Sequence, residues 1–285
     1  MPNILVLGAT GMLGRTVYQY LSREFPKNTW GTDRTSQGFF KLEASAPQSY
    51  FLSIQKKLGQ IDYVINCIGL LKNIPQKIEK DYEIINSLFP KKLAKLAEKY
   101  HFKIIHVSTD AVYSPLSGRV CEKDMPAPIG MYEESKYAGE IESKIVLNVR
   151  TSLLGLDPVN KKGLLEWALK NWDNSINGYY NQIWTGCTTL QFAEFCKNII
   201  AQNTFEVLNQ NSSVYHFAPL QSSKYDIIKT LLSLSDKPFM IKKTKGPQIT
   251  RTLYSAYSSI FCLHKYSNNL KTALKEIIKF DKRSI

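Results

Sequence analysis

The 285-residue sequence predicts an α/β fold in which a doubly wound parallel sheet is accompanied by a smaller α/β substrate-binding domain. The apolar run at residues 3–7, which shows no polar alternation, and the largely apolar stretches at residues 62–69 and 103–107 indicate buried strands, as in an all-parallel sheet. Helical periodicity between these runs is typical of βαβ units. We expect residues 1–155 to form the large domain and residues 156–285 mainly the smaller one, with room for segments that return to the large sheet.

Composition limits the chain to a globular class with no sign of membrane insertion. Apolar residues make up 44% of it, and no run is long and apolar enough to span a bilayer. The N-terminus lacks the basic region and cleavage site of a signal peptide. The five cysteines, at positions 67, 121, 187, 196 and 262, contain no Cys-x-x-Cys pair, which favours a reducing, cytoplasmic compartment over a disulfide frame or a metal site.

The net charge is strongly positive, 37 basic minus 24 acidic residues, or +13. A positive charge of this size could attract nucleic acid. The lysines are spread over predicted helices such as residues 91–95 and form no tract, so we expect a solvated surface and no nucleic-acid partner. A phosphate-bearing substrate or a peripheral membrane contact would also suit this charge. A homodimer is an open alternative to a monomer.

A glycine-rich turn follows the first predicted strand. Residues 3–7 lead into Gly8-Ala9-Thr10-Gly11-Met12-Leu13-Gly14, and residues 15–25 then show helical periodicity. In this setting the first glycine permits a tight turn, the second lets backbone approach a pyrophosphate, and the third lets the helix pack on the strand. The helix N-terminus favours the anion. We predict a Rossmann-like dinucleotide site that includes Thr10, Met12 and Leu13, with a glycine turn lacking any ligand as the alternative.

The second predicted strand, residues 29–32, ends in Asp33-Arg34. An acidic side chain at this place can hold the ribose diol of NAD, whereas an arginine can hold the 2′-phosphate of NADP. Arg15 and Arg34 together favour NADP, and NAD is the alternative cofactor. A surface ion pair is the interpretation that needs no ligand.

Polar and small residues follow the next strands and mark the candidate site. Cys67-Ile68-Gly69 closes the run at residues 62–69, where small residues suit close approach by a cofactor. A long helix predicted at residues 82–100 contains Asn86. A polar side chain there is usually at the surface or bonded locally, and a role in organising the site is the second interpretation.

The strand predicted at residues 103–107 ends in Ser108-Thr109-Asp110, with Val112 shortly after. Hydroxyl groups at the carboxyl edge of a parallel sheet face the ligand crevice, where one can donate a hydrogen bond to a substrate carbonyl. We place Ser108, Asp110 and Val112 beside the substrate. Asp110 could instead cap a turn, which is its commoner role.

Tyr132 and Lys136 form a Tyr-x-x-x-Lys motif in a helix predicted over residues 133–144. Positions i and i+4 share one helix face, so the phenol and the ammonium can point into the same site. A phenol has a pKa of about 10, and a cation beside it favours the phenolate and brings the proton into a useful range. A solvated helix face is the alternative.

Taken in this order, the motifs resemble the extended short-chain dehydrogenase/reductase family, and the stretches 108–113 and 132–140 resemble its dTDP-4-dehydrorhamnose reductases. The resemblance implies that Thr109 polarises a C4 carbonyl and that Tyr132 is the general acid. It also implies that Lys136 lowers the tyrosine pKa and binds the nicotinamide ribose, while Asn86 organises the active-site helix. The implied reaction is NAD(P)H-dependent reduction of a 4-keto nucleoside-diphosphate deoxysugar, for surface polysaccharide or glycan precursors.

The second half departs from these reductases in two places. Leu153 follows Arg150-Thr151-Ser152 where they usually have tryptophan, and residues 181–189 lack the proline of a Gln-x-Gly-x-Pro-Thr segment. We expect Trp184 and Thr188 to reach the sugar if that segment forms its wall, and packing is the alternative for Trp184.

The other elements of the second half are a strand and four helices. The strand is predicted at residues 214–217, and the helices at residues 163–172, 190–201, 223–234 and 263–280. A basic segment at residues 237–245 precedes Arg251, and the family often places a basic residue near the substrate diphosphate there.

Two other functions fit the same motifs. A nucleotide-sugar epimerase or epimerase-reductase needs a further acid–base pair, and related bifunctional enzymes tend to have a cysteine where this chain has Asp110; Cys121 lies farther along the loop. A non-catalytic regulatory subunit on the same fold is the third reading. Such relatives often lose the tyrosine or the lysine of the motif, and both are present here. Fold alone does not decide among the three.

Overall fold

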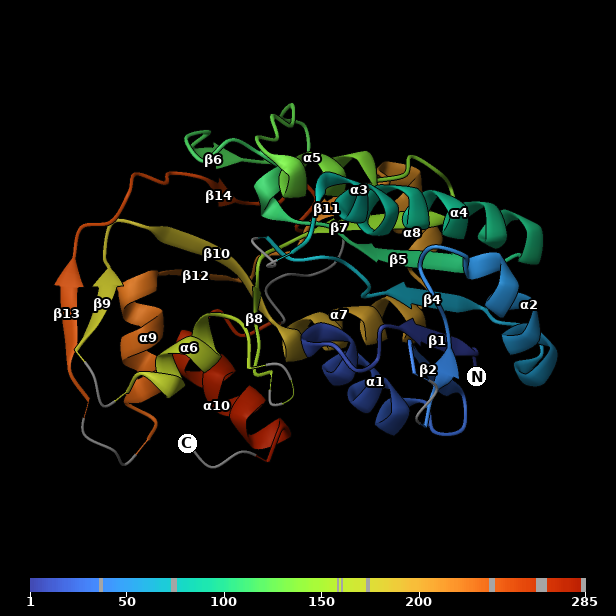
Figure 1. The fold of residues 1–285 in the computed structure, drawn as a ribbon, viewed down its shortest axis with the longest axis horizontal. Helices are drawn as coiled ribbons and strands as arrows, with labels where there is room; N and C mark the ends of the chain where they lie inside the picture. Colours follow the sequence, from blue (N-terminus) through green and yellow to red (C-terminus); the bar gives the residue numbers. More distant parts are fainter. Residues whose placement is uncertain are drawn as a thin grey trace.

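The computed structural model describes residues 1–35, 38–72, 76–157, 159, 161–172, 175–235, 239–259 and 266–282. Its largest sheet has seven strands, all paired in parallel, in the order β11-β7-β5-β4-β1-β2-β3 (Figure 1). The predicted doubly wound fold is therefore confirmed. The strands are β1 (Ile4–Leu7), β2 (Thr29–Asp33), β3 (Phe40–Lys41), β4 (Tyr63–Asn66), β5 (Lys103–Val107), β7 (Val146–Arg150) and β11 (Val214–His216).

Helices cover both faces of this sheet (Figure 1). One face carries α1 (Met12–Glu24), α7 (Thr189–Ala201) and α8 (Phe205–Asn211), and the other carries α2 (Pro47–Leu58) and α4 (Phe89–Tyr100). Alternate residues of a strand serve the two cores: in β1, residues 4 and 6 belong to the α1 side, and residues 5 and 7 to the α2 side. Burial on both faces explains why the strand segments of the sequence are largely apolar.

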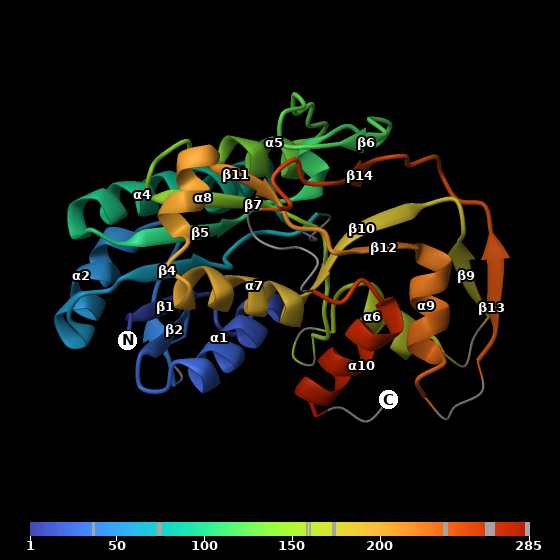
Figure 2. The same cartoon turned by 180° about the vertical axis from the view of Figure 1, so that it is seen from behind.

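The second half of the chain also builds a smaller α/β part at the end of the molecule away from the N-terminus (Figure 2). An apolar core that includes Leu165, Ile227 and Leu274 joins three of its helices. Its elements are β8 (Leu153–Leu154), α6 (Leu164–Lys170), β9 (Ile176–Tyr179), β10 (Ile183–Thr188), β12 (Leu220–Ser223), α9 (Lys224–Leu232), β13 (Ile241–Thr244) and α10 (Leu270–Phe280). β8, β10 and β12 form one small sheet, and β9 pairs with β13.

The two halves of the chain are interleaved. β11 extends the large sheet beside β7, and α7 and α8 pack on that sheet although they follow β10 in sequence. A short parallel pair joins β6 (Arg119–Val120) to β14 (Thr252–Leu253), residues from the two halves. The division of the chain near residue 155 stays a prediction.

The helix predicted at residues 82–100 contains a π-helical turn. The helical segment starts with α3 (Glu79–Tyr82), continues through the π-helix η1 (Glu83–Leu88) and ends with α4. Pro90 lacks the N–H that would bond the carbonyl of Asn86 in a regular α-helix, so the ladder is interrupted at this point. Single π-turns of this kind often occur at functional sites.

Helix α5 (Met131–Ala138) is shorter than the predicted helix at residues 133–144. The amide of Asn148 explains its end, because its Oδ1 accepts from the Ile141 N–H at 3.1 Å and its Nδ2 donates to the Ile141 carbonyl at 2.9 Å. These bonds hold residue 141 against β7, outside the helix. A Cβ at Gly139 would collide with the Asn86 carbonyl oxygen, so this glycine lets α5 approach the π-helix.

Some of the residues named in the sequence analysis lie outside the part of the chain that the structure describes. Of the helix predicted at residues 263–280, α10 accounts for residues 270–280, while residues 263–265 lie outside the described residues, as do Cys262 and Lys237. The thiols of Cys67, Cys121, Cys187 and Cys196 are free. Within the described ranges, no helix has both the length and the apolar character needed to cross a membrane.

Candidate functional site

A cleft of about 500 Å³ opens at the carboxyl edge of the large sheet, beside the point between β1 and β4 where the strand order reverses. Ligands of open α/β sheets bind at such a point. Its walls come from the glycine turn, the ends of four strands, helix α5 and the loop before α6. The described residues that line it are Gly11, Met12, Leu13, Arg34, Cys67, Ile68, Gly69, Leu70, Leu71, Val107, Ser108, Thr109, Tyr132, Lys136, Thr151, Ser152, Leu153, Asp157, Lys162 and Gly163.

The glycine turn has the backbone shape that a phosphate loop needs. Gly8 has φ +77°, a conformation that favours glycine. A Cβ at Gly14 would collide with the Gly8 carbonyl oxygen, so α1 can start against β1 only with glycine at this position. No side chain caps α1 at Gly11, and the first N–H groups of the helix therefore face the cleft without a side-chain acceptor. Thr10 is exposed at the tip of the turn.

The three charged residues predicted to select the cofactor have different surroundings. Asp33 bonds to the next turn, where Oδ1 accepts from the Thr35 N–H and Oδ2 from the Thr35 hydroxyl, both at 3.1 Å. Arg15 points to the far end of the chain, and its Nη2 donates to Asp281 Oδ1 at 2.8 Å. Of the two arginines, only Arg34 lines the cleft. Arg34 is therefore the arginine of this pair that faces the cleft.

The end of β4 forms the floor of the cleft, as expected for Cys67, Ile68 and Gly69. The Ile68 N–H donates to Asn66 Oδ1 at 3.1 Å, and Asn66 Nδ2 contacts His106 Nδ1 of the neighbouring strand at 2.9 Å. Burial raises the pKa of the Cys67 thiol. This cysteine is therefore an uncharged wall residue and not a nucleophile.

Asn86 organises the loop after β4 and does not itself line the cleft. Its Oδ1 accepts from the Leu70 N–H at 2.8 Å, and its Nδ2 donates to the Leu70 carbonyl at 3.2 Å. The same amide donates to Ser135 Oγ of α5 at 3.1 Å. Its side chain thus joins the π-helix, the rim of the cleft and the helix that carries Tyr132 and Lys136.

Thr109 and Tyr132 face each other at the inner end of the cleft. Burial raises the pKa of Tyr132 to about 12, and the carboxylate of Asp110 adds to this, while a hydrogen bond with Thr109 and the charge of Arg251 act in the opposite direction. The expected lowering of the tyrosine pKa by Lys136 is thus not found in the free chain, where burial dominates. The phenol is protonated at neutral pH.

Lys136 is buried, and its Nζ donates to the carbonyl of Val107 at 2.6 Å. Burial lowers the pKa of this lysine to about 8, although the charge of Glu140 raises it. The ammonium therefore lies at the end of β5, in the same cleft as the phenol. An ammonium there can donate further bonds to a ligand that enters, because it has three N–H groups.

The residues predicted for the substrate differ in accessibility. Ser108 lines the cleft, and Asp110 is half-buried behind it in the short 3₁₀ helix η2 (Asp110–Val112). Val112 is fully buried in an apolar cluster with Tyr113, Val120 and Leu253. The Val112 side chain therefore packs in the core, and its contact with substrate stays a prediction.

The two residues predicted from the 181–189 segment are engaged in the small sheet. Trp184 is partly buried against the core of the smaller part, in the position of a packed aromatic. Thr188 is the N-cap of α7, and its hydroxyl accepts from the Gln191 N–H at 3.1 Å. Neither is among the described lining residues, and their contact with a sugar stays a prediction.

Some lining residues did not emerge from the sequence. Leu70 and Leu71 come from the rim held by Asn86, and Asp157, Lys162 and Gly163 come from the loop before α6. This loop reaches the glycine turn, where a Cβ on Gly155 would touch the side chain of Met12. The sequence signal that could have indicated this loop is its position shortly after β7 and β8, since the carboxyl ends of parallel strands share one edge.

Comparison with known proteins bears on this arrangement. The family described as the RmlD substrate binding domain matches residues 2–245. The resemblance predicted from the sequence motifs is thereby confirmed. Among curated proteins, methionine adenosyltransferase 2 subunit beta of Danio rerio is 31% identical over 149 residues, 49% of this chain and 43% of that protein. The match thus spans less than half of that relative.

Solved structures share the fold over nearly the whole chain. A dTDP-4-dehydrorhamnose reductase of Bacillus anthracis str. Ames in complex with NADP has a TM-score of 0.75 at 19% identity, with 98% of each chain covered. An L-threonine dehydrogenase of Phytophthora infestans has a TM-score of 0.80 at 14% identity, covering 98% of this chain and 99% of that one. At these identities the likeness concerns the fold alone.

The two glycines after Gly8 allow folding and ligand approach to be tested separately. Gly14→Ala introduces a collision with the Gly8 carbonyl, so we expect a loss of roughly 1–3 kcal/mol in unfolding free energy, as for overpacking. Gly11→Ala places its Cβ at an ordinary 3.5 Å from the same oxygen, so stability should change little, while nicotinamide dinucleotide binding weakens. Urea unfolding and fluorescence titration with NADPH measure both. Equal stability of the two variants would contradict this account.

The pH dependence of stability tests the burial of Lys136. Its folded pKa of about 8 lies below the ordinary 10.5, so below pH 8 the folded chain carries a disfavoured charge. That penalty declines as pH rises from about 8 to 10.5, where the unfolded chain binds more protons than the folded one. We expect Lys136→Met to unfold at higher urea than the parent at pH 7, with the gap narrowing by pH 9.5. The exposed Lys144→Met is the control, and a pH-independent gap would refute the assignment.

Proposed function

This chain belongs to the RmlD substrate binding domain family, and from that membership we propose that it is an NADPH-dependent reductase of a 4-keto nucleoside-diphosphate deoxysugar. dTDP-4-dehydrorhamnose is one candidate substrate. The observation that carries the proposal is the meeting of Thr109, Tyr132 and Lys136 in one cleft with the uncapped glycine turn of α1. A nicotinamide dinucleotide suits this site, because the turn offers helix N–H groups to a pyrophosphate and Arg34 offers a cation to a 2′-phosphate.

Carbonyl reduction needs a hydride, a proton and stabilisation of charge on the oxygen. A reduced nicotinamide dinucleotide, held by the glycine turn and Arg34, would supply the hydride. Tyr132 gives its phenolic proton to the carbonyl oxygen, and its raised pKa keeps that proton in place at neutral pH until the charge develops. The Thr109 hydroxyl, which lies 3.3 Å from Asp110 Oδ1, is the second donor for the same carbonyl oxygen. Lys136 stabilises the phenolate that remains.

The substrate must therefore carry its ketone at the inner end of the cleft. Leu153 lines the wall where related reductases usually have tryptophan, so the sugar face of this cleft is aliphatic. This departure concerns the sugar and leaves Thr109, Tyr132 and Lys136 in place. The identity of the sugar therefore stays open, with dTDP-4-dehydrorhamnose as one candidate.

A regulatory subunit is the second candidate. The Danio rerio relative is named as the beta subunit of methionine adenosyltransferase 2, and its match covers 49% of this chain. Such a role would use the dinucleotide site for binding and leave the catalytic pair idle. The retained Tyr132 and Lys136 favour reduction.

Turnover with a panel of 4-keto-6-deoxy nucleotide sugars and NADPH tests the proposal, followed as loss of absorbance at 340 nm. We expect at least one substrate to be reduced, and Tyr132→Phe to lower kcat by ~10²–10⁴-fold with little change in NADPH affinity, because it removes only the acidic proton. Undiminished kcat in that variant would refute the role of Tyr132. NADPH binding without turnover, together with co-elution with a methionine adenosyltransferase catalytic subunit, would favour the regulatory candidate instead.

The cofactor preference depends on Arg34. We expect NADPH to bind more tightly than NADH, and Arg34→Gln to reduce this preference, since a guanidinium–phosphate contact is lost. Fluorescence titrations of the parent and the variant with each nucleotide measure it. Arg15→Gln is the matched control, because Arg15 is engaged with Asp281 and should leave the ratio unchanged. A parent that prefers NADH would remove the role given to Arg34.

A further inference from the structure

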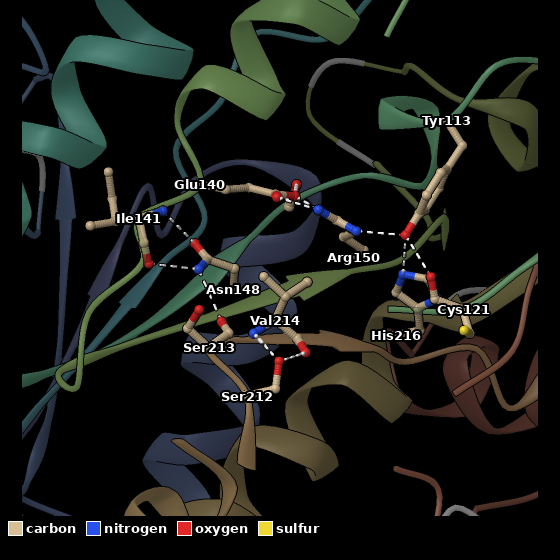
Figure 3. A network of polar contacts seen from close by, with 11 residues as sticks. Tyr113, Cys121, Glu140, Ile141, Asn148, Arg150, Ser212, Ser213, Val214 and His216 are labelled. Atoms are coloured by element: carbon tan, nitrogen blue, oxygen red, sulfur yellow. Dashed lines mark hydrogen bonds and ion pairs between the residues drawn. The ribbon is translucent and has the colours of Figure 1, made fainter. Parts of the chain in front are cut away.

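A buried ion pair lies directly behind the catalytic helix. Glu140 follows the last turn of α5, and Arg150 is the last residue of β7 (Figure 3). Arg150 Nε donates to Glu140 Oε1 at 2.8 Å and Nη2 to Oε2 at 2.7 Å, and the two side chains are 4% and 6% exposed. Two such charges are costly to bury, and two parallel bonds give the pair a defined geometry. The pair therefore fixes the end of α5 on the sheet.

The same carboxylate holds the residue that precedes Thr109. Ser108 Oγ donates to Glu140 Oε1 at 2.6 Å. Thr109 is extended, with φ −139° and ψ 151°, and neighbouring side chains of an extended chain point to opposite sides. Anchoring the Ser108 side chain toward Glu140 therefore directs the Thr109 side chain toward Tyr132.

The residue after Thr109 is held by a second arginine. Arg251 Nε donates to Asp110 Oδ2 at 3.0 Å, and its Nη1 donates to the Tyr113 carbonyl at 2.8 Å. The guanidinium of Arg251 thus donates hydrogen bonds to the 110–113 turn. The family resemblance had instead implied a basic residue in this region near a substrate diphosphate. Its side chain is 15% exposed and is not among the described residues that line the cleft.

Tyr113 connects the two arginines. Its hydroxyl accepts from Arg150 Nη1 at 2.6 Å, donates to the Cys121 carbonyl at 2.8 Å and contacts His216 Nε2 at 3.1 Å (Figure 3). Its carbonyl accepts from Arg251. The residues on both sides of Thr109 therefore belong to one polar network that runs from α5 and β7 to the segment at residue 251.

We propose that Glu140–Arg150 and Arg251 form a clamp on Ser108 and Asp110 that positions the Thr109 hydroxyl against Tyr132. This inference rests on the proposed reductase function, and it makes Glu140, Arg150 and Arg251 positioning residues. Their loss leaves the cofactor loop intact and displaces the hydroxyl that meets the substrate carbonyl. The charge of Arg251 also lowers the pKa of Tyr132, so the clamp acts on both groups that meet that carbonyl.

The position of Thr109 can be observed without turnover. Methyl NMR of protein labelled at threonine methyls, with Thr109→Ser to assign the Thr109 signal, reports the local environment. We expect Ser108→Ala and Arg251→Gln to shift or broaden this signal. Lys103→Gln is the matched control, because it breaks the Lys103–Glu206 ion pair near the other end of the same strand and should leave the Thr109 signal unchanged.

Kinetics with a ketone that the parent reduces tests whether a displaced Thr109 hydroxyl lowers turnover. We expect kcat to fall by roughly 10²-fold in Ser108→Ala, Arg251→Gln and Glu140→Gln, as for a misplaced reacting group, while Lys103→Gln matches the parent. In the variants that fold, NADPH affinity should stay within about threefold of the parent, because the clamp residues do not touch the dinucleotide and only the step at the ketone is affected. Glu140→Asp, which keeps the charge, should recover part of kcat. If Glu140→Gln does not fold, Ser108→Ala and Arg251→Gln still decide.

The outcomes separate the clamp from the proposed reaction. An unchanged Thr109 signal and unchanged kcat in Ser108→Ala and Arg251→Gln would overturn the clamp. Loss of NADPH affinity equal to the loss of kcat would also overturn it, because the effect would then be on the whole site. A parent that reduces no ketone of the panel would overturn the reductase proposal, and the methyl spectra alone would then decide the clamp.

Discussion

The candidate site depends on how closely α5 can approach the π-helical turn and the sheet. Gly139 packs against the carbonyl of Asn86, a contact that no larger residue allows, and Glu140 next to it is held by Arg150. Pro90 has no backbone N–H to bond the carbonyl of Asn86, and the helix is π-helical just before this residue. The side chain of Asn148 bonds to the backbone of residue 141, so the helix ends before that residue. With α5 fixed at its C-terminal end, Tyr132 and Lys136 are carried to the carboxyl edge of β5.

Burial sets the electrostatics of this edge. It raises the pKa of Tyr132 and lowers that of Lys136, so both shifts favour the uncharged forms. The buried Glu140 and Arg150 side chains differ, because each remains charged and is stabilised by its bonds to the other. Such a pair is weak evidence for stability, and its value here is geometric.

Much of the fold and of the candidate site could be predicted from local patterns. Several strands of the large sheet could be predicted because burial on both faces favours largely apolar stretches, and the glycine turn could be predicted because Gly8 and Gly14 have steric reasons to be glycine. Arg15 shows where such patterns are insufficient. An arginine close to the glycine turn in sequence favours a role at the cofactor, and in the structure its Nη2 donates to Asp281, 266 residues away. The hydroxyl of Thr188 caps α7, and its contact with a sugar stays a prediction.

The sequence by itself indicated the parallel sheet, the order of the motifs and the candidate site residues Thr109, Tyr132 and Lys136, because each is recorded in a stretch of a few residues along the chain. Tertiary structure decided which arginine faces the cleft, where α5 ends and how Ser108 and Asp110 are held. It also decided that burial outweighs nearby cations in setting the pKa of Tyr132. These outcomes depend on contacts between residues as distant as Asp110 and Arg251, and no local pattern records such distances.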